Sequence, residues 1–252
     1  MPRILLIDDR GRFPLDQQGR PLYIADAKGE GLGAAIRVTD EVYAVRVPRH
    51  VVKHVAVRGV STAHRFATDR VVAHAVALLN NREQYLYDPR DGSRVTFDAH
   101  GFVSRGARDL PIFPRLDAAV IGVVENPSRD AILLGMNRHR PGFFSCIAGY
   151  VEHGEDLEEA FYREVLEETG RRVHSITYAG SQPWAPSSTL MVGFFAQTED
   201  DTPVRETDEE LAEVIWATRN DLGGLKLPMP SSLARTLIEQ WASGNYEIRS
   251  EK

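Results

Sequence analysis

Residues 149–171 read GYVEHGEDLEEAFYREVLEETGR, and they contain the feature that most restricts how this chain can fold. In a helix, Glu164, Glu167 and Glu168 fall at positions i, i+3 and i+4, so their carboxylates share one short face. Like charges at this spacing destabilise a helix by roughly 0.2–0.5 kcal/mol per pair, which a surface helix avoids by spreading its acids. Something outside the helix must therefore compensate the repulsion.

The neighbouring residues predict that these carboxylates border a packed surface. On a helical wheel Phe161 and Val165 lie beside them and face a core. Gly170 fits the position just after a helix, and Gly149 and Gly154 bracket a tight loop that leads into it. Oxygen ligands held close together on a rigid element suit Mg²⁺, which binds through a few carboxylates plus substrate phosphates. The alternative interpretation is a solvated acidic helix face.

Composition and charge exclude several classes of protein. The net charge of −6 argues against a broad binding surface for duplex nucleic acid or anionic membranes. Apolar runs such as Ala118–Val124 are too short to span a bilayer, and the start, MPRILLIDDRGR, does not make a secretory signal. The expected location is therefore the cytoplasm. A single cysteine, Cys146, excludes an internal disulfide and a cysteine-rich zinc site.

The pattern along the chain predicts two parts with a boundary near residue 110. In the first part, Tyr43–Val47 and Val55–Val57 are short β-like runs, and a helix is expected at about Ala63–Leu79. The stretch QYLYDPRDGSRVTF, at 84–97, is typical of a hairpin because turn-forming pairs separate two β-rich runs. The second part is denser, with strands expected at 118–124, 131–137, 189–196 and 213–218 around a helix in the 149–171 segment, and a closing helix at 231–242.

The 149–171 segment resembles the signature of the Nudix hydrolases, G-x5-E-x7-R-E-U-x-E-E-x-G-U, in which U is aliphatic. The matching residues are Gly149, Glu155, Arg163, Glu164, Val165, Glu167, Glu168 and Gly170. Arg171 departs from the last aliphatic position, which bears on packing after the helix more than on chemistry. The resemblance implies the α+β class, with a Nudix α/β/α sandwich at 111–252, a smaller β-rich domain ending in a helix at 1–83, and a ribbon-like hairpin connector at 84–110.

The resemblance also implies a role for each charged residue of the segment. In that family the glutamates matching Glu164 and Glu168 bind Mg²⁺ or Mn²⁺, while Glu167 ligates the metal or assists in activating water. Glu155 pairs with Arg163 to hold the loop against the helix. Such cations neutralise a diphosphate, acidify a bound water and orient it for in-line attack on phosphorus.

Two further groups are implied as metal ligands by the same resemblance. One is the backbone carbonyl of Ala148, just ahead of the loop. The other is a glutamate in EELAEVIW, where Glu210 matches the family's additional metal-site residue and Glu213 is the nearby rival. The choice between these two glutamates stays open at the level of sequence.

A second motif indicates the substrate. SQPW at Ser181–Trp184, followed by Leu190 and Met191, resembles the array that marks the NADH pyrophosphatases among Nudix proteins. That array continues with Pro-Phe-Pro and a later serine, whereas this chain has Ala185–Ser187 and Thr189, a departure that bears on dinucleotide preference. The alternative is an ordinary surface loop. Substrate contacts are implied for Gln182, Pro183, Trp184, Ala185, Pro186, Ser187, Ser188 and Thr189.

Other stretches extend the resemblance over nearly the whole chain. Phe113, in FPRLDAAVI, would stack on a base, and Tyr150 could supply a second aromatic face. Either aromatic taken alone is more often a core residue. Ala234, in the closing helix, would lie near the bound nucleotide.

The middle of the chain departs most from the family. Many relatives carry two CxxC pairs that form a zinc ribbon, whereas residues 84–110 contain no cysteine. The expectation is therefore no structural zinc, with the hairpin keeping its shape through packing. The resemblance also implies a homodimer.

Three functions follow as hypotheses. The first is an NAD(H) diphosphatase that makes AMP and nicotinamide mononucleotide, or that removes the NAD cap from the 5′ end of RNA by the same cut. The second is a Nudix hydrolase for another diphosphate, such as ADP-ribose or a dinucleoside polyphosphate. The third is a nucleotide-binding regulator without turnover, which the complete set of glutamates disfavours.

Overall fold

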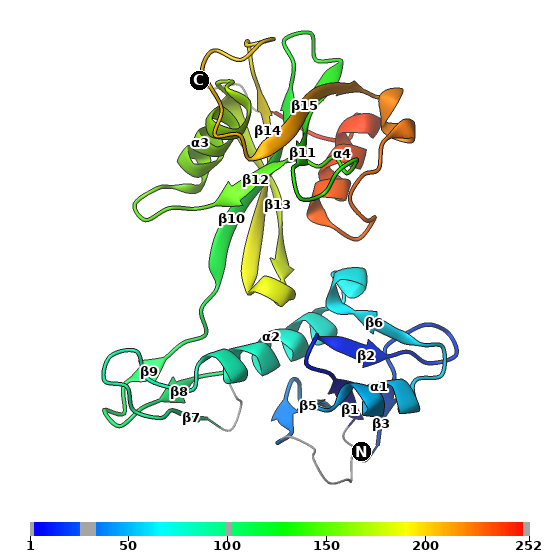
Figure 1. The fold of residues 1–252 in the computed structure, drawn as a ribbon, viewed down its shortest axis with the longest axis vertical. Coiled ribbons are helices and arrows are strands. Elements are labelled where there is room, and N and C mark those ends of the chain that lie inside the picture. The colour runs from blue at the N-terminus through cyan, green and yellow to red at the C-terminus, as the bar shows by residue number, and fades with distance from the viewer. Residues whose placement is uncertain (1–2, 26–33, 99–101, 249–252) are drawn as a thin grey trace. The chain divides into compact units, whose positions relative to one another are not determined.

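The computed structural model describes residues 3–25, 34–98 and 102–248, and the chain forms two compact units (Figure 1). The first unit consists of Met1–Leu116 together with Trp184–Ser188. The second consists of Asp117–Pro183 together with Thr189–Lys252. The first unit is thus built from two separate stretches of sequence.

The first unit contains a four-stranded sheet covered by one long helix. Its strands lie in the order β3 (Tyr23–Ile24), β1 (Arg3–Ile7), β5 (Val42–Arg46) and β4 (Ile36–Arg37), with β1 and β5 parallel. Helix α2 (Arg70–Gln84) is capped by Asp69, whose carboxylate accepts hydrogen bonds from the N–H groups of the first turn. Its buried face packs with residues of the sheet in one apolar core.

Two expectations for this unit were wrong. Val55–Val57 is not a strand, because Val55 ends helix α1 (Arg49–Val55). Val51, Val52 and Val55 follow helical spacing and pack with residues of β1 and β5 in a second, small core, which overrides the β preference of valine. The helix expected from Ala63 begins only at Arg70, since residues 63–66 form a 3₁₀ turn, η1 (Ala63–Phe66), before the cap.

Short strands complete the first unit. Strand β2 (Arg12–Pro14) pairs with β6 (Val60–Thr62). The hairpin expected at 84–97 is present as a bridge between Tyr87 and Arg94 around a turn. Inside that turn the buried carboxylate of Asp88 accepts three hydrogen bonds from Arg90, each 2.9 Å long. A three-stranded sheet follows, formed by β7 (Thr96–Phe97), β8 (Ser104–Arg105) and β9 (Pro111–Ile112).

The second unit is built on a six-stranded sheet. The order is β13 (His174–Trp184), β14 (Thr189–Gln197), β10 (Asp117–Glu125), β11 (Ala131–Asn137) and β15 (Leu211–Thr218), with β12 (Ile147–Tyr150) paired to β10. Four of these strands confirm the expected series, whereas β12 and β13 were not expected. Strands β10 and β14 are parallel and in register over their whole length. Two further 3₁₀ turns are η2 (Ala185–Ser187), which belongs to the first unit, and η3 (Asp221–Gly224) in the second.

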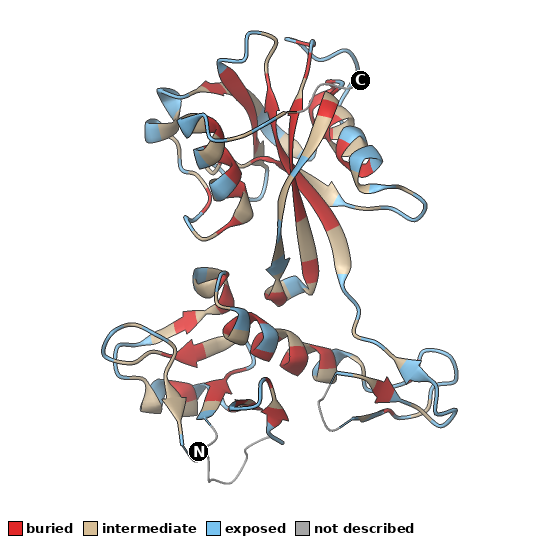
Figure 2. Cartoon of the chain, turned by 180° about the vertical axis from the view of Figure 1, so that it is seen from behind, coloured by how far each residue is buried: buried red, intermediate tan, exposed pale blue. Residues whose placement is uncertain are grey.

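One helix covers each face of this sheet, as Figure 1 shows. On one face Val120 of β10 packs with Phe161 of helix α3 (Leu157–Thr169). On the other, Ile121 packs with Trp241 of helix α4 (Leu233–Ser243). Figure 2 shows buried residues along the central strands and on the inner sides of the helices. The alternation of β10 between two cores confirms the expected α/β/α sandwich.

The ends of α3 are fixed by local chemistry. Asp156 and Glu159 form a capping box, in which each side chain accepts a hydrogen bond from the other residue's backbone N–H. Gly170 ends the helix in the left-handed conformation with φ of 69°. The capping box and Gly170 therefore determine where the helix that carries the three glutamates starts and ends.

A buried carboxylate at the end of β10 ties the last helix to the sheet. Glu125 is 1% exposed and accepts hydrogen bonds from Trp241 Nε1 at 2.9 Å, Gln197 Nε2 at 3.1 Å and the hydroxyl of Tyr246. Burial, reinforced by Glu125, raises the pKa of Tyr246 to about 12. The tyrosine therefore stays protonated and donates at any physiological pH.

We expect Glu125→Leu to lower the free energy of unfolding by about 3 kcal/mol, because it leaves buried donors without an acceptor. Urea unfolding followed by tryptophan fluorescence measures the loss. Glu206→Leu, at an exposed position, is the control and should change the free energy of unfolding by less than about 0.5 kcal/mol. Equal midpoints for the two variants would contradict the structural role of Glu125.

Candidate active site

Glu168 is the most deeply buried of the three glutamates on α3. It is 5% exposed, and its Oε2 is a buried oxygen without a hydrogen-bond partner among the described residues. Burial, and then the nearby carboxylates of Glu210, Glu164 and Asp208, raise its pKa to about 8. A backbone hydrogen bond from Ala148 acts in the opposite direction. An acid kept in such surroundings needs a positive partner before it can ionise easily.

Arg163 connects the other acids of the segment. Its guanidinium makes a bidentate pair with Glu155, at 2.6 and 3.0 Å, and also donates to Glu164 at 2.9 Å and Glu167 at 3.0 Å. A further hydrogen bond of 2.9 Å reaches the carbonyl of Tyr150 in β12. The contact with Arg163 lowers the pKa of Glu155, which stays ionised. The guanidinium of Arg163 therefore holds helix α3, the loop at Glu155 and strand β12 together.

Gly149 allows Glu164 to approach the sheet. A Cβ atom added at Gly149 would lie 1.9 Å from Cδ of Glu164, closer than any real contact allows. The expectation that Gly149 and Gly154 bracket a loop is correct only for Gly154, whose φ is +100°, because Gly149 lies within strand β12. The missing side chain at Gly149 lets the carboxyl group of Glu164 pack closely against strand β12. The burial of that carboxyl group is the main reason that its pKa is raised.

A cavity of about 380 Å³ in the second unit brings several predicted residues together. Ala148, Glu168 and Glu210 all line it, whereas Glu213 is absent from its lining. Sequence reasoning missed other residues of the wall, chiefly Asn137, Arg140 and Phe143. Asn137 ends β11, and Arg140 and Phe143 lie between β11 and β12. The available signal in the sequence was their proximity to the acidic segment.

The donor set suits a hard divalent cation. Glu168 supplies a buried oxygen without a partner, and Glu210 and the Ala148 backbone border the same cavity. Within residues 3–25, 34–98 and 102–248, no group of three or more His, Cys, Asp or Glu side chains stands close enough to hold an ion. Arg163 engages Glu164 and Glu167, so the carboxylates must turn from it to gather around a cation.

The predicted substrate residues of the second unit have different surroundings. Tyr150 is 55% exposed, and its hydroxyl lies 3.3 Å from Oγ1 of Thr189. Gln182 uses both ends of its amide to hold the start of α4, donating to the carbonyl of Ser231 and accepting from the N–H of Leu233, each at 2.8 Å. Pro183 is exposed in β13. Ala234 is buried in the core beneath α4.

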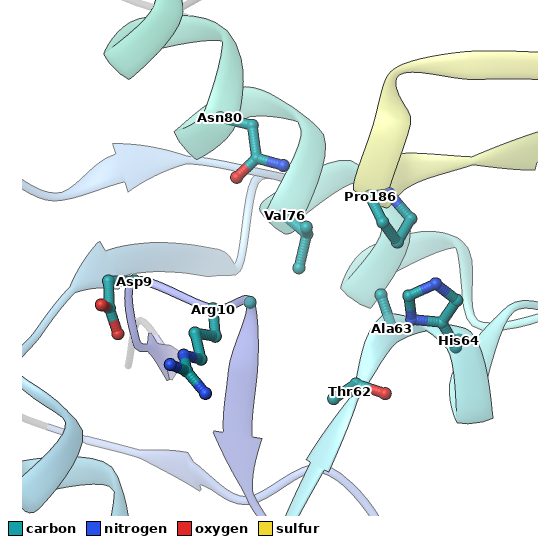
Figure 3. Close-up of a pocket in the computed structure, with 9 residues that line it drawn as sticks. Asp9, Arg10, Thr62, Ala63, His64, Val76, Asn80 and Pro186 are labelled. Carbon is teal, nitrogen blue, oxygen red and sulfur yellow. The ribbon is translucent and has the colours of Figure 1, made fainter. Parts of the chain in front are cut away.

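The rest of the predicted loop belongs to the first unit. Trp184 contacts the ring of His64 edge to face at 4.9 Å, and Ala185 is buried in the core of that unit. Pro186 lines a pocket of about 230 Å³, and Figure 3 shows it beside His64, opposite Asp9. Ser187, Ser188 and Phe113 also lie in this unit, and Phe113 is 65% exposed. Residues of this loop therefore pack within the first unit, which the motif alone did not indicate.

Arg171, the departure from the signature, is buried just after α3. Its guanidinium lies 5.3 Å from the ring centre of Trp216 and donates to the carbonyls of Thr169 and Asp201. Burial lowers its pKa. The long side chain thus fills an apolar position while its charge is met by carbonyl oxygens and an aromatic face.

Known proteins resemble the chain in both sequence and fold. The NUDIX domain matches residues 115–240. An NAD-capped RNA hydrolase, NudC from Mycobacterium bovis, is 32% identical over 95% of this chain and 86% of its own length. The human NAD-capped RNA hydrolase NUDT12 is 31% identical over 71% of this chain and 42% of its own length.

A solved structure agrees on the fold. The crystal structure of a NUDIX hydrolase from Nitrosomonas europaea has a TM-score of 0.50 and 16% identity, and the match covers 62% of this chain and 90% of that one. No helix of the described residues combines the length and apolar character that crossing a membrane requires. From its domain and its relatives, the chain belongs to the Nudix hydrolases, in the NADH pyrophosphatase family.

Proposed function

We propose that this protein hydrolyses the diphosphate bond of NAD(H), giving AMP and nicotinamide mononucleotide, and that the same cut removes NAD caps from RNA. The observation that carries the proposal is the buried, unpartnered oxygen of Glu168 in a cavity shared with Ala148 and Glu210. The relatives named NAD-capped RNA hydrolases, which match 95% of the chain in the bacterial case, support the choice of substrate. The proposal includes a homodimer, which light scattering of the purified protein tests.

Mg²⁺ or Mn²⁺ would be held by Glu164, Glu168, Glu210 and the carbonyl of Ala148, with Glu167 beside them. Such ions, when bound, neutralise a diphosphate and lower the pKa of a coordinated water. The side chain of Glu167 is 40% exposed, so it is accessible to a water molecule and can accept its proton. Arg163, fixed by Glu155, orients Glu164 and Glu167 and limits how far they move.

A second candidate is hydrolysis of another nucleoside diphosphate derivative, such as ADP-ribose or a dinucleoside polyphosphate. The observation that favours it is the altered loop at Ala185–Ser187. Ala185 is buried in the core of the first unit, and Trp184 packs on His64. Because Trp184 and Ala185 are engaged in these contacts, fewer side chains of the loop are left to recognise the second nucleoside of a dinucleotide substrate.

Cleavage of NADH in ¹⁸O-labelled water should place the label on the phosphate of AMP or of the reduced mononucleotide. Attack falls on phosphorus because Glu168 and Glu210 line a cavity suited to cations and phosphates. Mass spectrometry of the products, with nicotinamide still attached to ribose, is the measurement. Free nicotinamide as the main product would rule the proposal out, and inert NADH beside rapid ADP-ribose cleavage would establish the second candidate.

Glu168→Gln should lower turnover at least about a hundredfold, or roughly 2.7 kcal/mol in the barrier, because it removes one charge from the ion site. The same variant should stabilise the ion-free protein at pH 8. Folding raises the pKa of Glu168 from 4.5 to about 8, so the ion-free parent loses stability as pH rises between these values. We expect the melting temperature at pH 8 to rise by at least about 4 °C.

Kinetics at saturating Mg²⁺ and thermal melts in a chelator, at pH 5 and pH 8, check both halves of this prediction. Glu158→Gln, at an exposed position in the first turn of the same helix, is the matched control. It should leave turnover unchanged and should not show the pH-dependent gain. Near-normal turnover of Glu168→Gln would show that Glu168 is not a metal ligand.

Gly149→Ala should reduce turnover by at least about a hundredfold with little change in fold. The new methyl group would occupy the space of the Glu164 carboxyl and push that side chain out of position. Gly223→Ala is the control, since a Cβ there meets no atom within 4 Å. Turnover assays and circular dichroism of both variants make the comparison, and a fully active Gly149→Ala protein would contradict the geometry.

A further inference from the structure

The catalytic cavity has a positive residue as well as negative ones. Among the described residues that line it, Glu168 and Glu210 are the acids and Arg140 is the one arginine or lysine. Arg140 is exposed, and its guanidinium makes no ion pair with any described residue. It lies 5.9 Å from the ring centre of Phe143, which lines the same cavity. Its neighbour Arg138 instead pairs with Glu209 at 3.4 Å.

Hydrogen bonds fix the segment that carries Arg140. The side chain of Asn137 accepts from the N–H of His139 at 2.9 Å and donates to Glu210 at 3.2 Å. The backbone N–H of Arg140 donates to the carbonyl of Asn137, and that of Phe143 donates to the carbonyl of Arg140. The position of Arg140 is therefore linked through Asn137 to the acidic residue Glu210.

Arg140 offsets the negative charge that the rest of the molecule presents to a phosphorylated substrate. The chain has a net charge of −6, and the acids of α3 add a local negative field that repels a phosphorylated substrate. A guanidinium binds phosphate with two parallel hydrogen bonds, and an aromatic ring beneath it limits its motion. Arg140 and Phe143 offer this arrangement in the cavity that also contains Glu168.

On the basis of the proposed function, we infer that Arg140, supported by Phe143, forms a phosphate-binding subsite within the catalytic cavity. The phosphate belongs either to the diphosphate that is cut or to the phosphodiester that follows the cap in RNA. Both offer the same anionic oxygens to the guanidinium. Arg140 acts here as a substrate-binding residue, separate from the acids Glu168 and Glu210 of the same cavity.

The test compares Arg140→Ala with Arg140→Lys and with the parent on two substrates, NADH and a short NAD-capped RNA, at saturating Mg²⁺. We expect Arg140→Ala to raise KM about tenfold or more with kcat within about twofold, because ground-state binding is lost. Arg140→Lys should recover part of the affinity, since it restores the charge without the planar fork. Arg129→Ala, an exposed arginine at the opposite end of β11, should leave KM unchanged.

A higher KM for both substrates places the subsite at the diphosphate, and a higher KM for capped RNA alone places it at the phosphodiester. An unchanged KM for both overturns the inference, as does a loss confined to kcat. If the parent cleaves neither substrate, the proposed function fails while the subsite is still decided by calorimetric binding of ADP with Mg²⁺. At least tenfold weaker ADP binding by Arg140→Ala then supports the subsite, and equal binding rejects it.

Discussion

The guanidinium of Arg163 is the contact on which the rest of the site depends. It links Glu155 of the loop, Glu164 and Glu167 of α3 and the carbonyl of Tyr150 in β12, all within hydrogen-bonding distance. Each of these groups is negative or carries a partial negative charge, so one cation reduces the repulsion that the acidic face creates. Glu168 alone remains outside this arrangement, and its buried oxygen is left for a ligand of another kind.

The sheet determines where these groups can meet. Parallel pairing of β10 with β14, and antiparallel pairing of β10 with β12, place the carboxylate-bearing helix over one face and α4 over the other. Ala148, Gly149 and Tyr150 are consecutive residues of strand β12, and Gly149 lies against Glu164 of α3. Because the three lie on one strand, the Ala148 backbone, the space for Glu164 at Gly149 and the exposed ring of Tyr150 are fixed relative to one another.

Local signals predicted much of this arrangement, and contacts between distant residues account for the rest. The cap at Asp156, the end at Gly170 and the spacing of the glutamates are local, so the sequence sufficed for α3. The cavity wall at Asn137 and Arg140 was missed because it depends on strand pairing and on a contact with Glu210 far along the chain. Val55–Val57 was misassigned because tertiary burial outweighed intrinsic preference.

The discontinuous first unit restricts how the protein can be divided in the laboratory. Trp184–Ser188 belongs to that unit although the residues on either side belong to the second. A fragment that begins at Asp117 would carry Ala185 without the apolar core in which it is buried, and Trp184 without the ring of His64. Apolar groups exposed in this way promote association. Expression of the second unit alone therefore requires that the apolar residues at 184–188 be replaced by polar ones. Otherwise the first unit must be expressed together with it.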